Sequence, residues 1–390
     1  MLQPLEGSQA IAYAVALCRP QVIAAYPITP QTHIVENISK LVAEGTLHCE
    51  FISVESEFSA ASVVLGATMA GSRAYTASAS QGILLMAEVL FNIAGMRVPI
   101  VMTCANRAIS SPLSIWNDQQ DSMSVRDAGW IQLYCADNQE AVDTTIQAYK
   151  IAERTELPVM VCVDGFILTH TLEAIDVPTQ SQVDEFLPPF QFKRSLDPRH
   201  PLSFGTLVSP DFYTEARYSH HQALLKAETE ILFADQQWAA ISGRRCGGLL
   251  KVEGHPEAKV AILTIGSVLG TLQAALDEFP PKQPVKLIKL RCFRPFPVEA
   301  LKTACENLTD VIVLERAFSP GGGGIVGLEV LAALAELPTP PRVHSFAAGL
   351  GGRDIPLSLL EKLLESVGRA QHERFSIIDV ELSRLPEEDR

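Results

Sequence analysis

The sequence has no closely spaced cysteines and no excess of positive charge. Its eight cysteines are dispersed and form no Cys-x-x-Cys pair, so they lack the spacing expected of a zinc or iron–sulfur site. The formal net charge of −14 argues against a surface for nucleic acid or anionic lipid. We therefore expect no metal site and no redox centre on this chain. Any such centre would be on another polypeptide.

Signals for export or membrane insertion are also missing. The amino terminus has no cationic region followed by an apolar segment, so no signal peptide is expected. The most apolar helix-like stretch, 82–96, is interrupted by Glu88 and Asn92 and is too short to span a bilayer. These features predict a soluble, cytoplasmic protein.

What the chain does contain is a regular alternation of apolar runs and helical patterns. At 390 residues it exceeds the usual size of a single core, so two domains are expected. Strand, helix and strand with short turns predict the α/β fold class, with doubly wound parallel sheets. In the first domain the expected strands are 21–25, 48–54, 73–76, 99–104, 131–135 and 159–163. The helices expected there include 82–93 and 138–154.

A proline-rich arm separates the two α/β units. From about residue 178 to 237 the alternation stops, and only 219–233 has a helical pattern. A second unit begins near Lys259 with an apolar strand and a helix. We divide the chain into a first domain, 1–175, a connecting arm, 176–245, and a second domain, 246–390.

The segment Tyr26 to Pro30, Tyr-Pro-Ile-Thr-Pro, is the most informative local feature. Each proline fixes its own φ and favours an extended conformation in the residue before it. Thr29 is therefore expected on a stiff turn just beyond a buried strand, where open α/β sheets bind ligands. By itself the segment favours a tight turn with no function, and only the other polar patches change that interpretation.

Further polar patches follow other predicted strands. They are Glu55 to Glu57, Ser78 to Gly82, and Asn106 with Arg107, and the polar stretch 114–127 comes soon after. A parallel sheet gathers the carboxyl ends of its strands at one edge, so these patches are expected to share a crevice.

These motifs resemble the pyruvate:ferredoxin oxidoreductase family, and the chain is similar to its separate alpha subunit. The resemblance rests on motifs that keep the family's order over nearly the whole chain: 26–30, 55–58, 76–82, Arg107 with 114–118, 126–130, 164–166 and 349–354. It implies a thiamine pyrimidine-type first domain and a transketolase C-terminal-like second domain. It also implies a thiamine diphosphate site shared with a beta subunit, which would hold the diphosphate and Mg²⁺. Gamma- and delta-type subunits would carry [4Fe-4S] clusters.

The resemblance assigns chemistry to three residues. Glu57 matches the glutamate that hydrogen-bonds the aminopyrimidine ring nitrogen of thiamine, where it favours the imino form that can accept a proton. Arg107 matches the partner of the substrate carboxylate, which suits its planar guanidinium. Thr29 matches the hydroxyl that binds a substrate oxygen. The alternative roles are a helix N-terminal charge for Glu57 and a surface ion pair for Arg107.

Other residues carry weaker expectations. Ser80, Gln81 and Gly82 match a segment that contacts the cofactor ring region, but we favour helix capping as the main role of the serine and glycine. Asn117 and Asp118 match a polar loop near the entrance that would contact substrate, or they are solvated turn residues. The glycine run 321–324 precedes a helix, as phosphate loops do, but it has no P-loop lysine, and we favour a structural role.

The resemblance implies oxidative decarboxylation of a 2-oxo acid with coenzyme A, giving acyl-CoA, carbon dioxide and reduced ferredoxin. Pyruvate is the first choice of substrate. A sister enzyme could use an aromatic or longer 2-oxo acid, such as phenylglyoxylate or 2-oxoglutarate, with ferredoxin or NAD as acceptor. An alternative of another class is a non-catalytic scaffold subunit.

Overall fold

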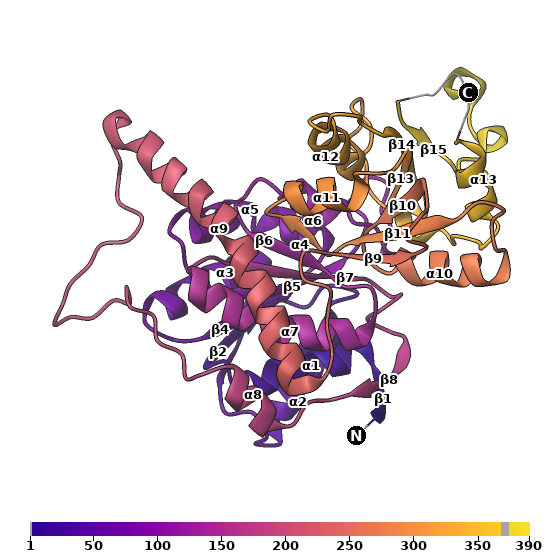
Figure 1. Ribbon diagram of the computed structural model, residues 1–390. Coiled ribbons are helices and arrows are strands. Elements are labelled where there is room, and N and C mark those ends of the chain that lie inside the picture. The colour runs from indigo at the N-terminus through magenta and orange to yellow at the C-terminus, as the bar shows by residue number, and fades with distance from the viewer. Residues whose placement is uncertain (1, 368–373) are drawn as a thin grey trace.

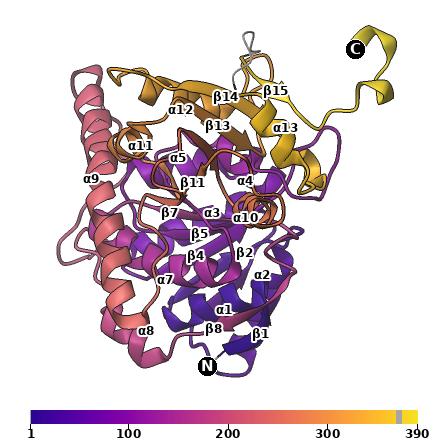
Figure 2. The same ribbon diagram turned by 45° about the vertical axis from the view of Figure 1, so that its right-hand side comes forward.

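The structure is a computed structural model that describes residues 2–367 and 374–390. It contains one seven-stranded and one six-stranded sheet, both mostly parallel and covered by helices (Figures 1 and 2). The predicted α/β class with parallel-sheet domains is confirmed.

The first sheet has the strand order β12-β6-β7-β5-β4-β2-β3, and every strand except β12 is parallel to its neighbours. Its central strands are continuous apolar runs buried on both faces, as parallel sheets require. The strands are β2 (Val22–Ala25), β3 (Glu50–Ser53), β4 (Ala74–Ser78), β5 (Val101–Asn106), β6 (Ile131–Tyr134), β7 (Val159–Asp164) and β12 (Cys292–Arg294).

Two groups of helices cover this sheet and belong to separate hydrophobic cores. The first group is α1 (Gly7–Leu17), α2 (Thr32–Ala43) and α7 (Asn138–Thr155). The second is α3 (Glu57–Met69), α4 (Ser80–Leu85), α5 (Ala87–Gly95) and α6 (Gln120–Ser124). Side-chain caps fix where α3 and α7 begin: Ser56 accepts from Ser59 N, and Asp137 accepts from Glu140 N. The predicted continuous helix 82–93 is wrong, because the chain breaks it at Met86, between α4 and α5.

The second sheet has the order β15-β14-β13-β10-β11-β9, with only β9 antiparallel to its neighbour. Its strands are β9 (Leu250–Gly254), β10 (Val260–Thr264), β11 (Val285–Leu290), β13 (Asp310–Glu315), β14 (Arg342–Ala347) and β15 (Ser376–Ile377). Its helices are α10 (Val268–Glu278), α11 (Val298–Cys305), α12 (Ile325–Leu334) and α13 (Leu359–Glu365). Short 3₁₀ turns span Leu350–Gly352, Leu382–Arg384 and Glu387–Asp389.

Antiparallel strands at the margins were not foreseen. β1 (Leu2–Glu6) pairs with β8 (Leu172–Asp176) in a small sheet of their own. β9 and β12 add antiparallel edges to the two large sheets. Most residues of β1 and β9 are exposed or only partly buried, so neither strand forms the continuous apolar run that reveals a central strand.

The connecting arm contains α8 (Gln180–Phe186) and the 33-residue α9 (Pro210–Ser242). Helix α9 is longer than the predicted 219–233, with Pro210 in its first turn and Gly243 at φ +76° just after its end. Its second half is anchored in the first core through buried side chains such as Ile231 and Trp238. Its first turns extend beyond the body of the molecule in Figure 1.

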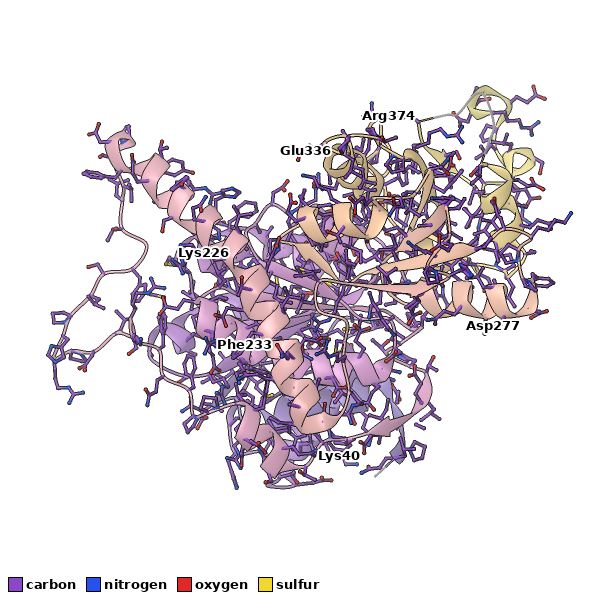
Figure 3. All side chains as sticks on the ribbon, in the orientation of Figure 1. Lys40, Lys226, Phe233, Asp277, Glu336 and Arg374 are labelled. Carbon is purple, nitrogen blue, oxygen red and sulfur yellow. The ribbon has the colours of Figure 1, made fainter. Side chains whose placement is uncertain are left out.

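The two sheets are joined by a common core. Residues of α3 and α5 lie in the same hydrophobic cluster as residues of β10, β13 and α12. Charged side chains lie outside it: Lys40, Asp277 and Glu336 are exposed on the surface (Figure 3). Among residues 2–367 and 374–390, no helix has the length and apolar character needed to cross a bilayer.

Candidate active site at the carboxyl edge of the first sheet

The Tyr26–Pro30 segment forms the predicted turn beyond β2. The fully buried side chain of Gln31 fixes this turn through two hydrogen bonds. Its Oε1 accepts from Ile28 N at 3.2 Å, and its Nε2 donates to the Ala77 carbonyl of β4 at 2.9 Å. The side chain of Thr29 stays exposed, while Pro30 is buried. The turn therefore presents Thr29 at the sheet edge on a fixed backbone.

Glu57 is a buried carboxylate without a protein partner. It lies in the first turn of α3, directly after β3, and is 6% exposed. Within the part of the chain that the structure describes, no hydrogen bond or ion pair reaches its side chain. Glu55 differs, because its carboxylate lies in solvent and accepts from Ser59. A buried acceptor normally has a donor, so Glu57 is arranged to meet a ligand.

Gly82 brings α4 close to that carboxylate. A Cβ on Gly82 would lie 2.6 Å from Glu57 Oε1 and 2.4 Å from Ser78 Oγ. Glycine is therefore required here by close approach, and the predicted pair of Glu57 and Gly82 is brought together. Ser80, two residues earlier, has φ +50°, an unusual conformation for a serine.

A buried aspartate, Asp121, fixes Ser80 and Arg107 in place. Its Oδ2 accepts from Ser80 N at 2.8 Å and from Arg107 N at 3.0 Å. Its Oδ1 accepts from Asn106 Nδ2 and Ser122 N, both at 2.7 Å. Burial raises the pKa of Asp121, and these donors oppose the increase. Asp121 thus ties the ends of β4 and β5 to α6.

Arg107 reaches across the sheet edge to the Thr29 turn. Its Nη1 donates to the Thr29 carbonyl at 2.9 Å and its Nε donates to the Ser114 carbonyl at 3.2 Å. The side chain is only 8% exposed, and burial lowers the pKa of Arg107, although Asp121 opposes that effect. Arg107 and Thr29 therefore lie together, with the remaining guanidinium N–H groups available to an anion.

Asn117 and Asp118 are buried under the second domain rather than solvated. Asp118 accepts from Gln120 N at 2.8 Å and from Gly351 N at 3.2 Å. Gly352 packs so closely that a Cβ there would lie 2.4 Å from Trp116 Cβ. Burial raises the pKa of Asp118 to about 6, since its two backbone donors only partly compensate. The 349–354 motif of the second domain thus closes over the 114–118 loop.

Several buried polar atoms of this region have no hydrogen-bond partner among the described residues. They include Gln81 Nε2, Ser78 Oγ and both polar side-chain atoms of Asn117. Ser80 behaves differently, because its hydroxyl lies within hydrogen-bond distance of Gln81 Oε1, at 2.6 Å, and of the Ala108 carbonyl. Together with Glu57, the unpartnered atoms fit a polar ligand at the carboxyl edge of the sheet.

Three positioning residues were not found from the sequence. Gln31 and Asp121 are described above. The third is Asp164, which accepts from Gln119 Nε2 at 2.9 Å and from Ser267 N at 2.8 Å and so joins the two domains. Asp164 belongs to the 164–166 motif of the family resemblance. Nothing in the local sequence indicates that its partner is Ser267, 103 residues away.

The fold and the buried polar residues define a two-domain α/β protein with a candidate ligand site at the carboxyl edge of a parallel sheet, where the second domain packs on the 114–118 loop. Comparisons with known proteins agree with this class. Residues 13–235 match the family described as pyruvate flavodoxin/ferredoxin oxidoreductase, thiamine diphosphate-binding. Residues 258–360 match the pyruvate:ferredoxin oxidoreductase core domain II. The chain belongs to the pyruvate flavodoxin/ferredoxin oxidoreductase family.

Relatives match along most of the chain. It is 45% identical over 378 residues to pyruvate synthase subunit PorA of Methanosarcina barkeri, covering 96% of this chain and 94% of that one. The corresponding PorA of Methanothermobacter thermautotrophicus is 45% identical over 367 residues, covering 93% and 94%. Ketoisovalerate oxidoreductase subunit VorA of Pyrococcus abyssi is 40% identical over 366 residues, covering 93% and 92%.

A solved structure has the same fold. The 2-oxoglutarate:ferredoxin oxidoreductase from Magnetococcus marinus, with 2-oxoglutarate, coenzyme A and succinyl-CoA bound, superposes with a TM-score of 0.71 at 20% identity. The match covers 93% of this chain and 65% of that one, so this chain spans just under two thirds of that solved chain.

Proposed function

We propose that this chain is the alpha subunit of a thiamine diphosphate-dependent 2-oxoacid:ferredoxin oxidoreductase, with pyruvate as substrate. The reaction is oxidative decarboxylation with coenzyme A to acyl-CoA, carbon dioxide and two electrons. The similarity to two PorA subunits along more than nine tenths of the chain supports pyruvate. The buried and unpartnered Glu57 carboxylate is the observation that carries the assignment of this site.

Glu57 would hold the pyrimidine half of thiamine. The bound cofactor supplies the carbon nucleophile and the electron sink of the reaction. The carboxylate of Glu57 would accept a hydrogen bond at the ring nitrogen and so set the protonation state of the neighbouring amino group. The unpartnered Gln81 Nε2 fits a ring beside that carboxylate, and the absence of a side chain at Gly82 lets α4 approach it closely. The chain therefore supplies the proton-handling part of the site.

Arg107 and Thr29 would orient the substrate. The guanidinium of Arg107 can pair with the carboxylate of a 2-oxo acid, and burial strengthens such a charge-assisted contact. The exposed hydroxyl of Thr29, on a turn fixed by Gln31, can donate to a substrate oxygen as negative charge develops. Asn117 and Asp118 would line the entrance beneath the 349–354 motif.

The remaining parts of the reaction would come from partner subunits. A beta subunit would anchor the diphosphate and Mg²⁺, and gamma- and delta-type subunits would carry the [4Fe-4S] clusters that pass electrons to ferredoxin. The dispersed cysteines of this chain, all buried except the partly buried Cys49, fit that division, because a cluster needs several thiolates close to one another.

The test is Glu57→Gln in the complex reconstituted with its partner subunits. Turnover with pyruvate is expected to fall about 100-fold to 10,000-fold, the range of general acid–base catalysis, because the amide does not reproduce the carboxylate's hydrogen bond. Glu55→Gln is the matched control, since Glu55 is exposed, and it should retain activity. Full turnover by the Glu57 variant would favour the scaffold alternative. The same assay with 2-oxoisovalerate and 2-oxoglutarate tests the choice of pyruvate.

A further inference from the structure

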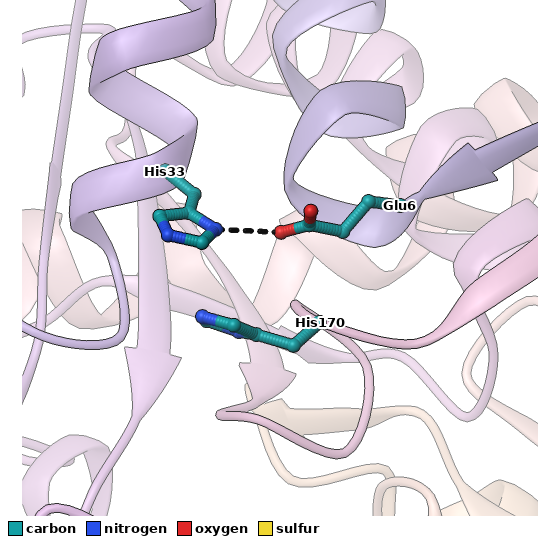
Figure 4. Close-up of side chains that lie close together, drawn as sticks. All are labelled: Glu6, His33 and His170. Carbon is teal, nitrogen blue, oxygen red and sulfur yellow. Dashed lines mark hydrogen bonds and ion pairs between the residues drawn. The ribbon is translucent and has the colours of Figure 1, made fainter.

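Three potential metal ligands from distant parts of the sequence meet beside the Thr29 turn. Glu6 ends β1, His33 is the second residue of α2, and His170 lies in the turn between β7 and β8 (Figure 4). One ligand atom from each residue can be chosen so that all three lie within 4.8 Å of one another. In Figure 4 the His33 ring faces the Glu6 carboxylate, and the His170 ring lies below the His33 ring.

Among the described residues, the contacts within this cluster leave two imidazole nitrogens, His33 Nε2 and His170 Nε2, without a hydrogen-bond partner. His33 Nδ1 lies 2.7 Å from Glu6 Oε1, and the two imidazole rings lie 4.5 Å apart at 34°. His170 Nδ1 lies 2.7 Å from Thr169 Oγ1, but His170 Nε2 has no hydrogen-bond partner among the described residues. An ion pair between Glu6 and His33 therefore explains two of the three side chains only.

The ring of His170 is oriented by a hydrogen-bond contact at Nδ1, as is common for histidines that bind metals. A ligand histidine usually bonds its second nitrogen to a neighbouring oxygen, which fixes the ring. Thr169 Oγ1 does this for Nδ1, and that oxygen also accepts from Phe166 N at 2.8 Å. The ring of Phe166 lies 4.7 Å from the His170 ring at 32°. The unpartnered Nε2 is thus presented on an oriented ring.

We propose that Glu6, His33 and His170 bind a divalent transition-metal ion of the zinc class. Two imidazoles and one carboxylate form a common ligand set for such an ion, with water completing a tetrahedron. Ligand bonds of about 2.0–2.1 Å place tetrahedral ligand atoms roughly 3.4 Å apart. The partly exposed side chains of Glu6 and His33 can adjust to that spacing.

The bound ion would stabilise the segment around Pro30, next to the candidate ligand site. It would join β1, α2 and the turn after β7, and α2 begins two residues after Pro30. The turn after β7 also packs on that segment, since a Cβ on Gly165 would lie 2.6 Å from Pro30 Cγ. Spacing in the sequence gives no hint of this site, because the ligands lie at positions 6, 33 and 170.

The experiment uses the full chain, stripped with a chelator and titrated with Zn²⁺ in equilibrium dialysis and with Co²⁺ in visible absorption. One equivalent per chain is expected, with the d–d bands of four-coordinate cobalt and a higher thermal midpoint. His33→Gln and His170→Gln should abolish this binding. Thr169→Val should weaken it about 10- to 100-fold, the usual effect of losing an outer-shell partner. His48→Gln and His221→Gln are controls on exposed histidines and should leave it unchanged.

Two results would overturn the proposal. One is the absence of saturable stoichiometric binding by the parent chain. The other is unchanged affinity in His33→Gln and His170→Gln variants whose circular dichroism matches the parent. Should a histidine variant fail to fold, Glu6→Gln provides the same comparison at the partly exposed carboxylate, and unchanged affinity there has the same meaning.

Discussion

At the residue scale, burial separates side chains that look alike in the sequence. Glu55 and Glu57 are two residues apart, yet only Glu57 is withdrawn from solvent without a partner. Glu55 is exposed to solvent, and its carboxylate accepts a hydrogen bond from Ser59. A carboxylate that has left water without gaining a donor is costly unless a ligand replaces it. That difference supports the proposed role of Glu57.

Gly82→Ala should damage the site without unfolding the chain. The new Cβ would meet Glu57 Oε1 at 2.6 Å and Ser78 Oγ at 2.4 Å, so the carboxylate must move. We expect turnover of the reconstituted complex to fall at least about 100-fold, because misplacement by about 1 Å has that effect. Gly66→Ala is the matched control within α3, where an added Cβ meets nothing within 4 Å and should be neutral or stabilising. Equal activity of the two variants would contradict this account.

Asp118 should give the protein a pH-dependent stability. Its pKa is raised from 3.8 to about 6, so the unfolded chain releases this proton first as the pH rises. The stabilising contribution of Asp118 to the free energy of unfolding is complete below about pH 4. It is lost as the pH rises from about 4 to 6. The displacement corresponds to about 3 kcal/mol. Urea unfolding of the parent and Asp118→Asn from pH 4 to 7 should show the parent losing stability relative to the variant. If the free energies of unfolding of the parent and the variant changed in parallel with pH, this role of Asp118 would be disproved.

At the element scale, the start of helix α12 is satisfied by the chain itself. The carboxylate of Glu315, at the end of β13, accepts from Ile325 N, Val326 N and Gly327 N at 2.8–3.0 Å. A Cβ on Gly324 would lie 2.3 Å from Glu315 Oε1, so this glycine permits the approach. The position that a phosphate would take at this helix end is therefore occupied by a side chain. This observation argues against a phosphate site at the 321–324 run.

Glu315→Ala should destabilise the second domain strongly. It leaves three backbone N–H groups buried without an acceptor, each worth about 1–3 kcal/mol, so the loss should be at least about 3 kcal/mol. Glu315→Gln keeps one acceptor oxygen and should lose less. Burial raises the pKa of Glu315 to about 7, so the comparison should be repeated above and below that pH. Chemical unfolding measures both variants, and equal stability would refute the capping role.

At the scale of the whole molecule, the two domains are fixed to one another by a common core and by buried charges. Glu140 of α7 pairs with Lys289 of β11 and lies 3.5 Å from Arg291 Nε. All three side chains are less than 7% exposed. This arrangement fixes how the second domain faces the first, and hence where the 349–354 motif lies over Asp118.

Glu140→Gln should therefore weaken the contact between the domains. It leaves two buried cations without their carboxylate, which typically costs about 3–5 kcal/mol. Adding Lys289→Met should recover part of that loss, because it removes one uncompensated charge. Asp197→Asn, in an exposed ion pair with Arg199, is the control and should not move the unfolding midpoint. A Glu140 variant as stable as that control would rule out this role.

The sequence could predict the parts of the fold that depend on local patterns. Apolar runs marked the central strands, and Thr29, Glu57, Ser80 and Arg107 were placed at strand ends that the structure brings to one edge. The break at Met86 and the full length of α9 were missed. A helical pattern continues through a one-residue break, and the polar first half of α9 lacks the apolar face that reveals a helix.

The sequence by itself determined the α/β class, the central parallel strands and the polar residues at their carboxyl ends. Those features follow from periodicity and from residues close to each other in the chain. Only the tertiary structure decided that Asp121 joins Ser80 to Arg107, that the second domain covers Asp118, and that Glu6, His33 and His170 meet. These contacts depend on how sheets and loops pack across long sequence separations, and no local pattern encodes which distant partner completes a buried polar group.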